Sequence, residues 1–156
     1  MPIDPYLATP TGDTIGRPME IVLVEDDLED AGLTIEVLRE SEIHCRVSLV
    51  RDGEEAMEFL NRQGRYARTP RPDLILLDLK LPKKDGREVL GEIREDPELR
   101  RVPVVVLTVS TTHRDLLIDE ELYVEAYLVK PFNHAEFVEV VRSLRKYLLS
   151  DVIVPR

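Results

Sequence analysis

The sequence predicts an α/β fold in which a parallel five-stranded sheet lies between two layers of helices. Short aliphatic and β-branched runs alternate along the chain with longer segments of helical periodicity, a pattern typical of a parallel sheet covered on both faces. Most of these runs are apolar without interruption, as expected for strands that are buried on both sides. The 156 residues suit one domain of ordinary size.

The predicted strands are residues 20–24, 45–50, 73–78, 102–108 and 125–130. Right-handed crossovers leave few ways to connect parallel strands in one sheet. For five strands the order 2-1-3-4-5 is the commonest, so we expect the flavodoxin-like (βα)5 three-layer sandwich.

The predicted helices are residues 28–41, 52–64, 85–96, 111–123 and 133–149, of which the fourth has the weakest periodicity. In the first helix, Leu33, Val37 and Leu38 have helical spacing, with Ala31, Thr34 or Ile35 beside them. Asp52 is expected to cap the second helix and Gly64 to end it.

Composition excludes several classes of function. A net charge of −10 disfavours nonspecific binding to nucleic acid and adhesion to anionic membranes. No apolar run approaches the ~20 residues that span a bilayer. Residues 1–18 are rich in proline and glycine and lack the pattern of a secretory signal, so we expect a flexible extension there. The single cysteine, Cys45, permits no internal disulfide, which favours a cytoplasmic location.

Polar residues follow four of the predicted strands: Glu25, Asp26 and Asp27 after the first, Asp78 in the third, Thr108 in the fourth and Lys130 in the fifth. In the predicted order the first and third strands are neighbours, so their acids meet in the crevice beyond the carboxyl ends, where ligands of such sheets bind. A lone aspartate at a strand end is usually a helix cap or a turn former, and Lys130 alone could be solvated. The combination at one edge favours a functional site.

This set of residue types fits phosphoryl chemistry. Clustered carboxylates repel one another and attract a hard cation, and Mg²⁺ prefers oxygen ligands. A carboxylate oxygen beside such a metal can attack a phosphoryl group in line, giving an aspartyl phosphate. Lys130 and Thr108 could donate to the phosphoryl oxygens. We expect Asp27 to be solvated or to cap the following helix, and not to bind the metal.

Four segments, IVLVEDD, DLILLDLKLPKKDG, VPVVVLT and AYLVKPF, resemble the receiver domain of two-component response regulators in order and spacing. The resemblance covers residues 19–149 and leaves 1–18 as the extension and 150–156 as a tail. The segments LPKKDGREVL and RQGRYARTPRPDL are most similar to those of stand-alone regulators paired with phytochrome-type histidine kinases.

The resemblance implies a metal-dependent phosphoacceptor site. Asp78 would take the phosphoryl group from the phosphohistidine of a sensor histidine kinase. Glu25 and Asp26 would be the acidic pair at the metal. Asp26 and Asp78 would bind Mg²⁺ directly, with the backbone carbonyl of Lys80 as a third ligand.

It also implies roles for residues around the phosphoryl group. Thr108 and Lys130 would contact it, and the bond between Lys130 and Pro131 would be cis. Tyr127 would be the switch aromatic that turns inward when Thr108 moves toward the phosphate. The alternative for Tyr127 is an aromatic on an edge strand that packs beside the last helix.

The implied protein is a single-domain response regulator that catalyses only its own phosphorylation and dephosphorylation. Its output would be a protein–protein contact, such as a homodimer, through the face formed by helix four, strand five and helix five. The C-terminal apolar residues either extend this dimer surface or fold back on their own core: Tyr147, Leu148, Leu149, Val152 and Ile153.

Three alternatives remain. A phosphohydrolase with an aspartyl-phosphate intermediate commonly has a second aspartate two residues after the first, where this chain has Lys80. A receiver used only as a scaffold is disfavoured because all the site residues are present. A flavin-binding protein of this fold would need a phosphate loop after the first strand, where the acids would repel phosphate.

Overall fold

The computed structural model describes residues 2–3, 16–109 and 122–148. Its strands are β1 (Pro2–Ile3), β2 (Met19–Val24), β3 (Cys45–Val50), β4 (Leu74–Asp78), β5 (Val104–Thr108) and β6 (Ala126–Val129). Its helices are α1 (Leu28–Glu40), α2 (Gly53–Leu60), α3 (Gly86–Glu95) and α5 (His134–Ser143). Short 3-10 turns lie at Gly64–Tyr66, Leu99–Arg101 and Arg145–Tyr147. No helix among these residues is long and apolar enough to cross a membrane.

The sheet confirms the predicted topology. Its parallel strands lie in the order β3-β2-β4-β5-β6, which is 2-1-3-4-5 when the parallel strands alone are counted. Strand β1 was not predicted from the sequence; it pairs antiparallel with the outer edge of β3. The two residues of β1 lie opposite Ser48 and Val47. The parallel sheet is therefore bordered at this edge by the N-terminal segment.

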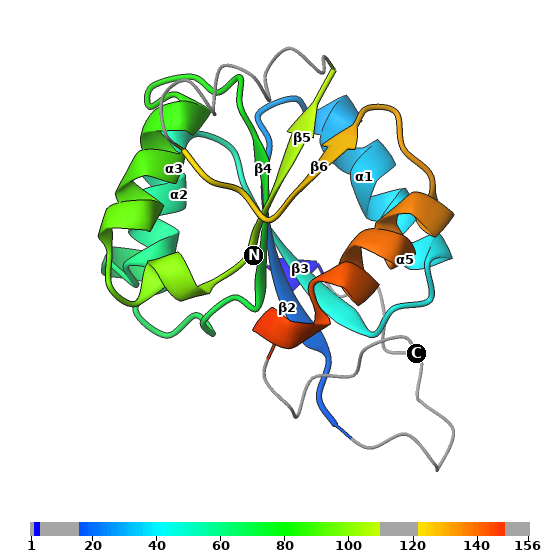
Figure 1. Ribbon diagram of the computed structural model, residues 1–156. Helices are drawn as coiled ribbons and strands as arrows, with labels where there is room; N and C mark the ends of the chain where they lie inside the picture. Colours follow the sequence, from blue (N-terminus) through cyan, green and yellow to red (C-terminus); the bar gives the residue numbers. More distant parts are fainter. Residues whose placement is uncertain (1, 4–15, 110–121, 149–156) are drawn as a thin grey trace.

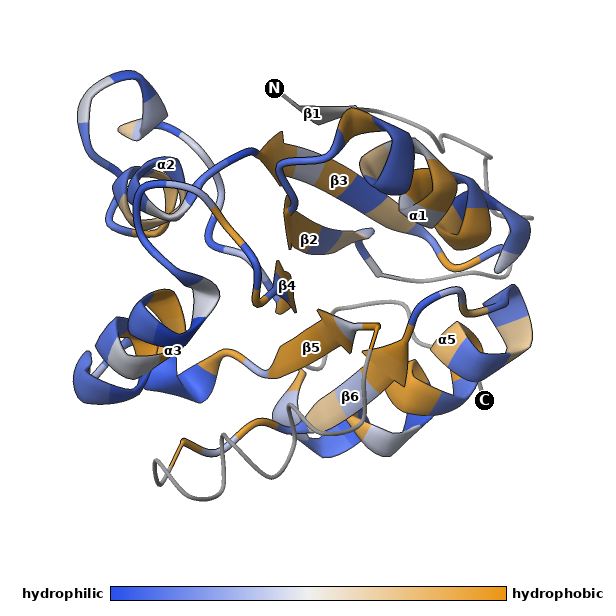
Figure 2. Ribbon diagram, turned by 90° about the horizontal axis from the view of Figure 1, so that it is seen from above, coloured by the Kyte–Doolittle hydropathy of each residue, from blue (hydrophilic) through white to orange (hydrophobic). Residues whose placement is uncertain are grey.

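Two apolar layers enclose the sheet (Figure 1). Helices α2 and α3 cover one face, where Phe59, Leu90 and Ile93 are buried. Helices α1 and α5 cover the other, where Leu38 and Phe137 are buried. Viewed from above, the strands are orange through most of their length and the helices carry their blue residues outward (Figure 2). Burial on both faces explains why these strands are apolar without alternation.

The buried face of α1 is drawn from the residues predicted to have helical spacing. Ala31, Thr34 and Leu38 are buried, whereas Leu33 is 62% exposed. The predicted residues cover more than one side of the helix, and Leu33 lies on the side away from the core. Leu33 is consequently available to a groove described below.

Two helix ends also differ from the prediction. Asp52 caps α2 as predicted, since its side chain accepts from the Glu55 backbone N–H at 2.7 Å. However, the helix ends at Leu60, and Gly64 instead begins a 3-10 turn with a φ of 55°. The last helix ends at Ser143, six residues before the predicted Leu149, because a 3-10 turn follows it. Most of the fourth predicted helix (111–123) lies outside the described residues.

Candidate functional site

The carboxyl ends of β2, β4, β5 and β6 bring the predicted polar residues to one edge of the sheet. Parallel pairing aligns Val24 of β2 with Leu77 of β4, so Glu25 and Asp78 leave the two strands at the same level. Thr108 ends β5 and pairs with Val129 of β6. The side chains gather around one cleft of about 300 Å³: Glu25, Asp26, Asp27, Asp30, Asp78, Lys80, Thr108, Val109 and Lys130.

Lys130 is the central cation of this cleft. Its Nζ donates to Glu25 Oε1 at 2.5 Å and to Asp78 Oδ2 at 2.9 Å, and it lies 3.4 Å from Asp30 Oδ2. The bond from Lys130 to Pro131 is cis. The carboxylates beside Lys130 raise the pKa of its ammonium group, so it stays charged throughout the physiological range.

Both oxygens of Asp78 are oriented by donors of this chain. The backbone N–H of Lys80 donates to Oδ1 at 2.9 Å, while Lys130 holds Oδ2. The Asp78 side chain is 14% exposed, so it is accessible from the cleft although its strand is buried. A carboxylate held this way is presented to a reactant in a fixed orientation.

Glu25, Asp26 and Asp78 form a site suited to a metal ion. One carboxylate oxygen from each residue lies within 4.8 Å of the others. Glu25 is buried, and burial together with the neighbouring Asp78 raises its pKa to about 7. Hard oxygen ligands, and an excess of acidic residues over Lys80 and Lys130 in the described lining of the cleft, fit Mg²⁺, which usually binds one or two carboxylates and keeps several waters.

Two further predicted residues have clear structural positions. Asp27 caps α1, because its Oδ1 accepts from the backbone N–H groups of Glu29 and Asp30. This agrees with the expected capping role, although Asp27 also lines the cleft. Tyr127 of β6 is partly buried against the core on the α2–α3 side. This face is opposite the one that α5 covers, so Tyr127 does not pack beside the last helix as the alternative expected, and its role as a switch residue stays a prediction.

Asp30 and Arg51 also contact residues of this site, and neither was predicted from the sequence. Asp30 lies one turn into α1 and faces Lys130, which the three-residue spacing from Asp27 could have suggested. Arg51 follows β3, and its Nη2 donates to the backbone carbonyl of Asp26 at 3.0 Å. Because strands β3 and β2 are neighbours, the residue after β3 was a candidate for this edge once the strand order was predicted.

Comparison with known proteins agrees with this geometry. The family model of the response regulator receiver domain matches residues 21–142. The response regulator Rcp1 of Synechocystis is 47% identical over 143 residues, which cover 92% of this chain and 97% of Rcp1.

Solved structures of response regulators are also similar to this chain. The Mn²⁺-bound form of Rcp1 superimposes with a TM-score of 0.68 at 47% identity, covering 89% of this chain and 100% of that one. The phosphorylated cyanobacterial phytochrome response regulator RcpA gives 0.69 at 45% identity, covering 89% and 99%.

A magnesium-bound receiver domain of the Pseudomonas aeruginosa sensor histidine kinase PA1611 gives a TM-score of 0.65 at 34% identity, covering 83% and 98%. Relatives of this chain therefore hold divalent cations in the same fold, as its acidic cluster suggests. The chain belongs to the receiver-domain family of two-component response regulators, and it is most similar to the stand-alone regulators of phytochrome kinases.

Proposed function

We propose that this chain is a single-domain response regulator that accepts a phosphoryl group on Asp78 from a sensor histidine kinase, in a reaction that needs Mg²⁺. The observation that carries the proposal is the contact of Lys130 with both Glu25 and Asp78, beside three carboxylate oxygens within 4.8 Å of one another. An active site of this composition both holds a cation and presents a nucleophile.

In the proposed reaction, a carboxylate oxygen of Asp78 attacks phosphorus while the bond from phosphorus to the histidine nitrogen breaks. Asp26, Asp78 and the Lys80 backbone carbonyl would hold Mg²⁺, with Glu25 beside them, and the bound ion would neutralise charge on the phosphoryl oxygens. The ammonium of Lys130 would exchange its bond to Asp78 for one to a phosphoryl oxygen. The Thr108 hydroxyl, which lines the same cleft, would donate to another.

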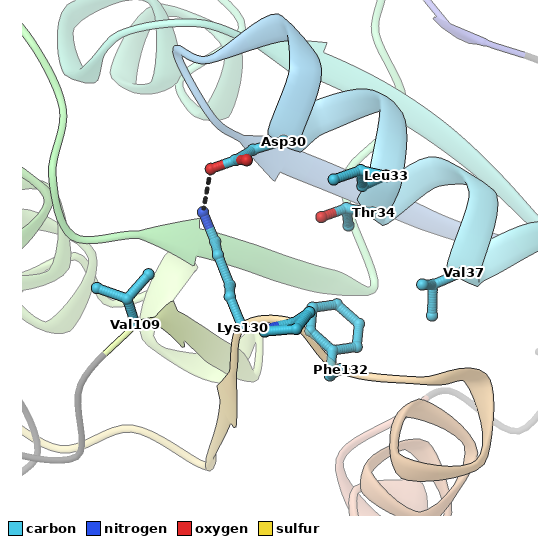
Figure 3. Close-up of a pocket in the computed structure, with 8 residues that line it drawn as sticks. Asp30, Leu33, Thr34, Val37, Val109, Lys130 and Phe132 are labelled. Atoms are coloured by element: carbon cyan, nitrogen blue, oxygen red, sulfur yellow. Dashed lines mark hydrogen bonds and ion pairs between the residues drawn. The ribbon is translucent and has the colours of Figure 1, made fainter.

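An apolar groove beside the acidic cleft supports a protein as the phosphoryl donor (Figure 3). It encloses about 260 Å³ and is lined by Asp30, Leu33, Thr34, Val37, Val109, Lys130, Pro131 and Phe132. Leu33 and Val109 are 62% and 63% exposed. The groove shares Asp30, Val109 and Lys130 with the acidic cleft. We propose that the kinase docks here, since a surface continuous with the cleft would bring its phosphohistidine to Asp78.

The output would be a contact between proteins, such as a homodimer, through helix four, β6 and α5. Exposed apolar side chains on the described part of this side support it, namely Tyr123, Val129 and Tyr147. Leu148 was predicted either to extend the dimer surface or to fold back on the core. It is partly buried against the core on the side covered by α5. Leu149, Val152 and Ile153 lie outside the described residues.

Intact-mass spectrometry after incubation with acetyl phosphate and Mg²⁺ tests the proposal. Wild type should gain one phosphoryl group, and both Asp78→Asn and wild type in excess EDTA should gain none. Uptake by Asp78→Asn would show that another residue is the acceptor. A wild type that never gains mass, even with a kinase as donor, would contradict the proposed function.

A further inference from the structure

The turn that joins β3 to α2 contacts both loops that carry the proposed metal ligands. This β3–α2 turn consists of Arg51, Asp52 and Gly53, none of which lines the acidic cleft. On one side, Arg51 Nη2 donates to the backbone carbonyl of Asp26 at 3.0 Å. That bond ties the turn to the β2–α1 loop (25–27), which holds the acidic pair.

On its other side the turn contacts the β4–α3 loop, residues 79–85. Asp52 Oδ2 lies 3.5 Å from Lys83 Nζ, and the backbone N–H of Gly53 donates to the Pro82 carbonyl at 3.5 Å. Asp52 reaches this loop while its other oxygen caps α2. The β3–α2 turn therefore spans the carboxyl end of β2 and meets the loops on either side of the site.

The contact at Gly53 leaves no room for a side chain. A Cβ built at this position would lie 1.9 Å from the backbone oxygen of Lys84 and 2.5 Å from its Cβ. The constraint is the close approach of two backbones, so it cannot be relieved by turning a flexible side chain. Any larger residue at position 53 must displace the β4–α3 loop or the start of α2.

Displacement of the β4–α3 loop would move residues of the proposed metal site. The second residue of this loop is Lys80, whose N–H donates to Asp78 Oδ1 at 2.9 Å and whose carbonyl is a proposed ligand. Its far end is equally confined, because a Cβ at Gly86 would lie 2.6 Å from the Asp78 carbonyl. The loop is held between the starts of α2 and α3, and it has little freedom to absorb a shift on one side.

We propose that the β3–α2 turn is a positioning element that sets the distance between the two metal-ligand loops, with Gly53 as its essential residue. The inference rests on the proposed function, since it concerns Mg²⁺ binding at that site. Groups that orient metal ligands from outside the coordination sphere typically change metal affinity by about 10- to 100-fold when replaced. Gly53 would act through Lys80 and Asp78 without touching the ion.

The test is calorimetric titration of the full chain with Mg²⁺, comparing wild type with Gly53→Ala. Gly32→Ala and Gly91→Ala are matched controls, because each adds the same methyl group to a helix and meets nothing within 4 Å. We expect Gly53→Ala to raise the Kd for Mg²⁺ about tenfold or more and both controls to stay within about twofold of wild type. Phosphoryl uptake from acetyl phosphate at low Mg²⁺ should fall in parallel and recover at high Mg²⁺.

An unchanged Kd in a folded Gly53→Ala would overturn the inference, even if the variant melts at a lower temperature. If Gly53→Ala does not fold, the same Mg²⁺ titration of Asp52→Asn tests whether the β3–α2 turn affects metal binding. This variant keeps the cap oxygen but loses the ion pair with Lys83, and Glu54→Gln is its control for charge. A Kd at least about threefold above that of Glu54→Gln would support the inference, and a smaller difference would refute it. Wild type that binds no Mg²⁺ and takes up no phosphate would instead contradict the proposed function.

Discussion

Both edges of the sheet bury carboxylates, but the two edges treat them differently. At the amino edge, Asp73 precedes β4 and accepts from Arg17 at 2.7 and 2.9 Å and from the Glu20 backbone N–H at 2.8 Å. Glu125 precedes β6 and accepts from Arg94 at 2.8 Å and from the Val104 backbone N–H at 2.6 Å. Each acid there has its own arginine and a backbone donor.

At the carboxyl edge, the acids outnumber the cations among the described residues that line the cleft. Glu25, Asp78 and Asp30 share the single ammonium group of Lys130, and Asp26 lies within the same cluster of oxygens. A carboxylate that has its own cation and hydrogen-bond donor stabilises the fold. A cluster of carboxylates that share one cation favours the binding of a further cation. An excess of negative charge, and not burial alone, therefore distinguishes the edge proposed to be functional from the structural one.

Among the tests of the difference between the two edges, the largest expected effect is that of removing Lys130 on the rate of phosphoryl uptake. Lys130→Ala leaves the carboxyl edge without the cation that contacts Glu25 and Asp78, and it removes a proposed donor to the phosphoryl group. We expect the rate of phosphoryl uptake from acetyl phosphate to fall by at least about 100-fold. The measurement is a time course of intact mass at saturating Mg²⁺, with Lys146→Ala as a control for the loss of one exposed charge. A rate close to wild type would mean that Lys130 only balances charge.

The second test compares the two edges directly by the same substitution at each. Asp73→Asn should lower the free energy of unfolding by about 2 kcal/mol, because it breaks a bidentate ion pair that is largely buried on the carboxylate side. Asp26→Asn should leave that free energy unchanged or raise it by up to about 1 kcal/mol in metal-free buffer, since it relieves repulsion among carboxylates.

Urea unfolding in EDTA gives both values, and repeating it with Mg²⁺ sharpens the contrast. A bound ion stabilises the folded state by mass action. Wild type and Asp73→Asn should gain equally from Mg²⁺, whereas Asp26→Asn should gain little. Equal destabilisation by both substitutions in EDTA would remove the distinction between the two edges.

The functional edge was easier to predict than the structural one. Strand alternation gave the order of the sheet, and that order alone brings residues at the ends of strands to a common edge. The presence of Glu25, Asp26, Asp78, Thr108 and Lys130 around one cleft follows from it. Their chemical roles remain predictions.

The contacts at the amino edge could not be predicted from the order of the strands. Arg17 lies in the proline-rich lead, 56 residues from Asp73, and no local pattern links the two. Arg51 was not predicted for the same reason, because its contact with the Asp26 carbonyl depends on how two turns pack together. Local patterns specify an element and its cap, as at Asp52, but a contact between loops depends on tertiary packing.

The smallest expected effect concerns the pH dependence of stability at the functional edge. Glu25 has a pKa raised to about 7 in the folded protein, from an ordinary value of 4.5. Between these pH values the folded state binds more protons than the unfolded state, so the free energy of unfolding should fall as the pH rises from about 4.5 to about 7. Its slope from this group is at most about 1.4 kcal/mol per pH unit.

Urea unfolding of metal-free protein across this range measures the slope, and Glu25→Gln is the matched variant that cannot titrate. The decline should be present in wild type and smaller in Glu25→Gln. Saturating Mg²⁺ should also reduce it, because a bound cation favours the ionised carboxylate. Burial and the neighbouring Asp73 also raise the pKa of Glu20 at the amino edge, so Glu20 adds a slope of the same sign, and only the part of the slope that Glu25→Gln removes belongs to Glu25. If Glu25→Gln kept the full slope, the buried acid responsible would lie elsewhere, and the charge excess assigned to this cleft would be too large.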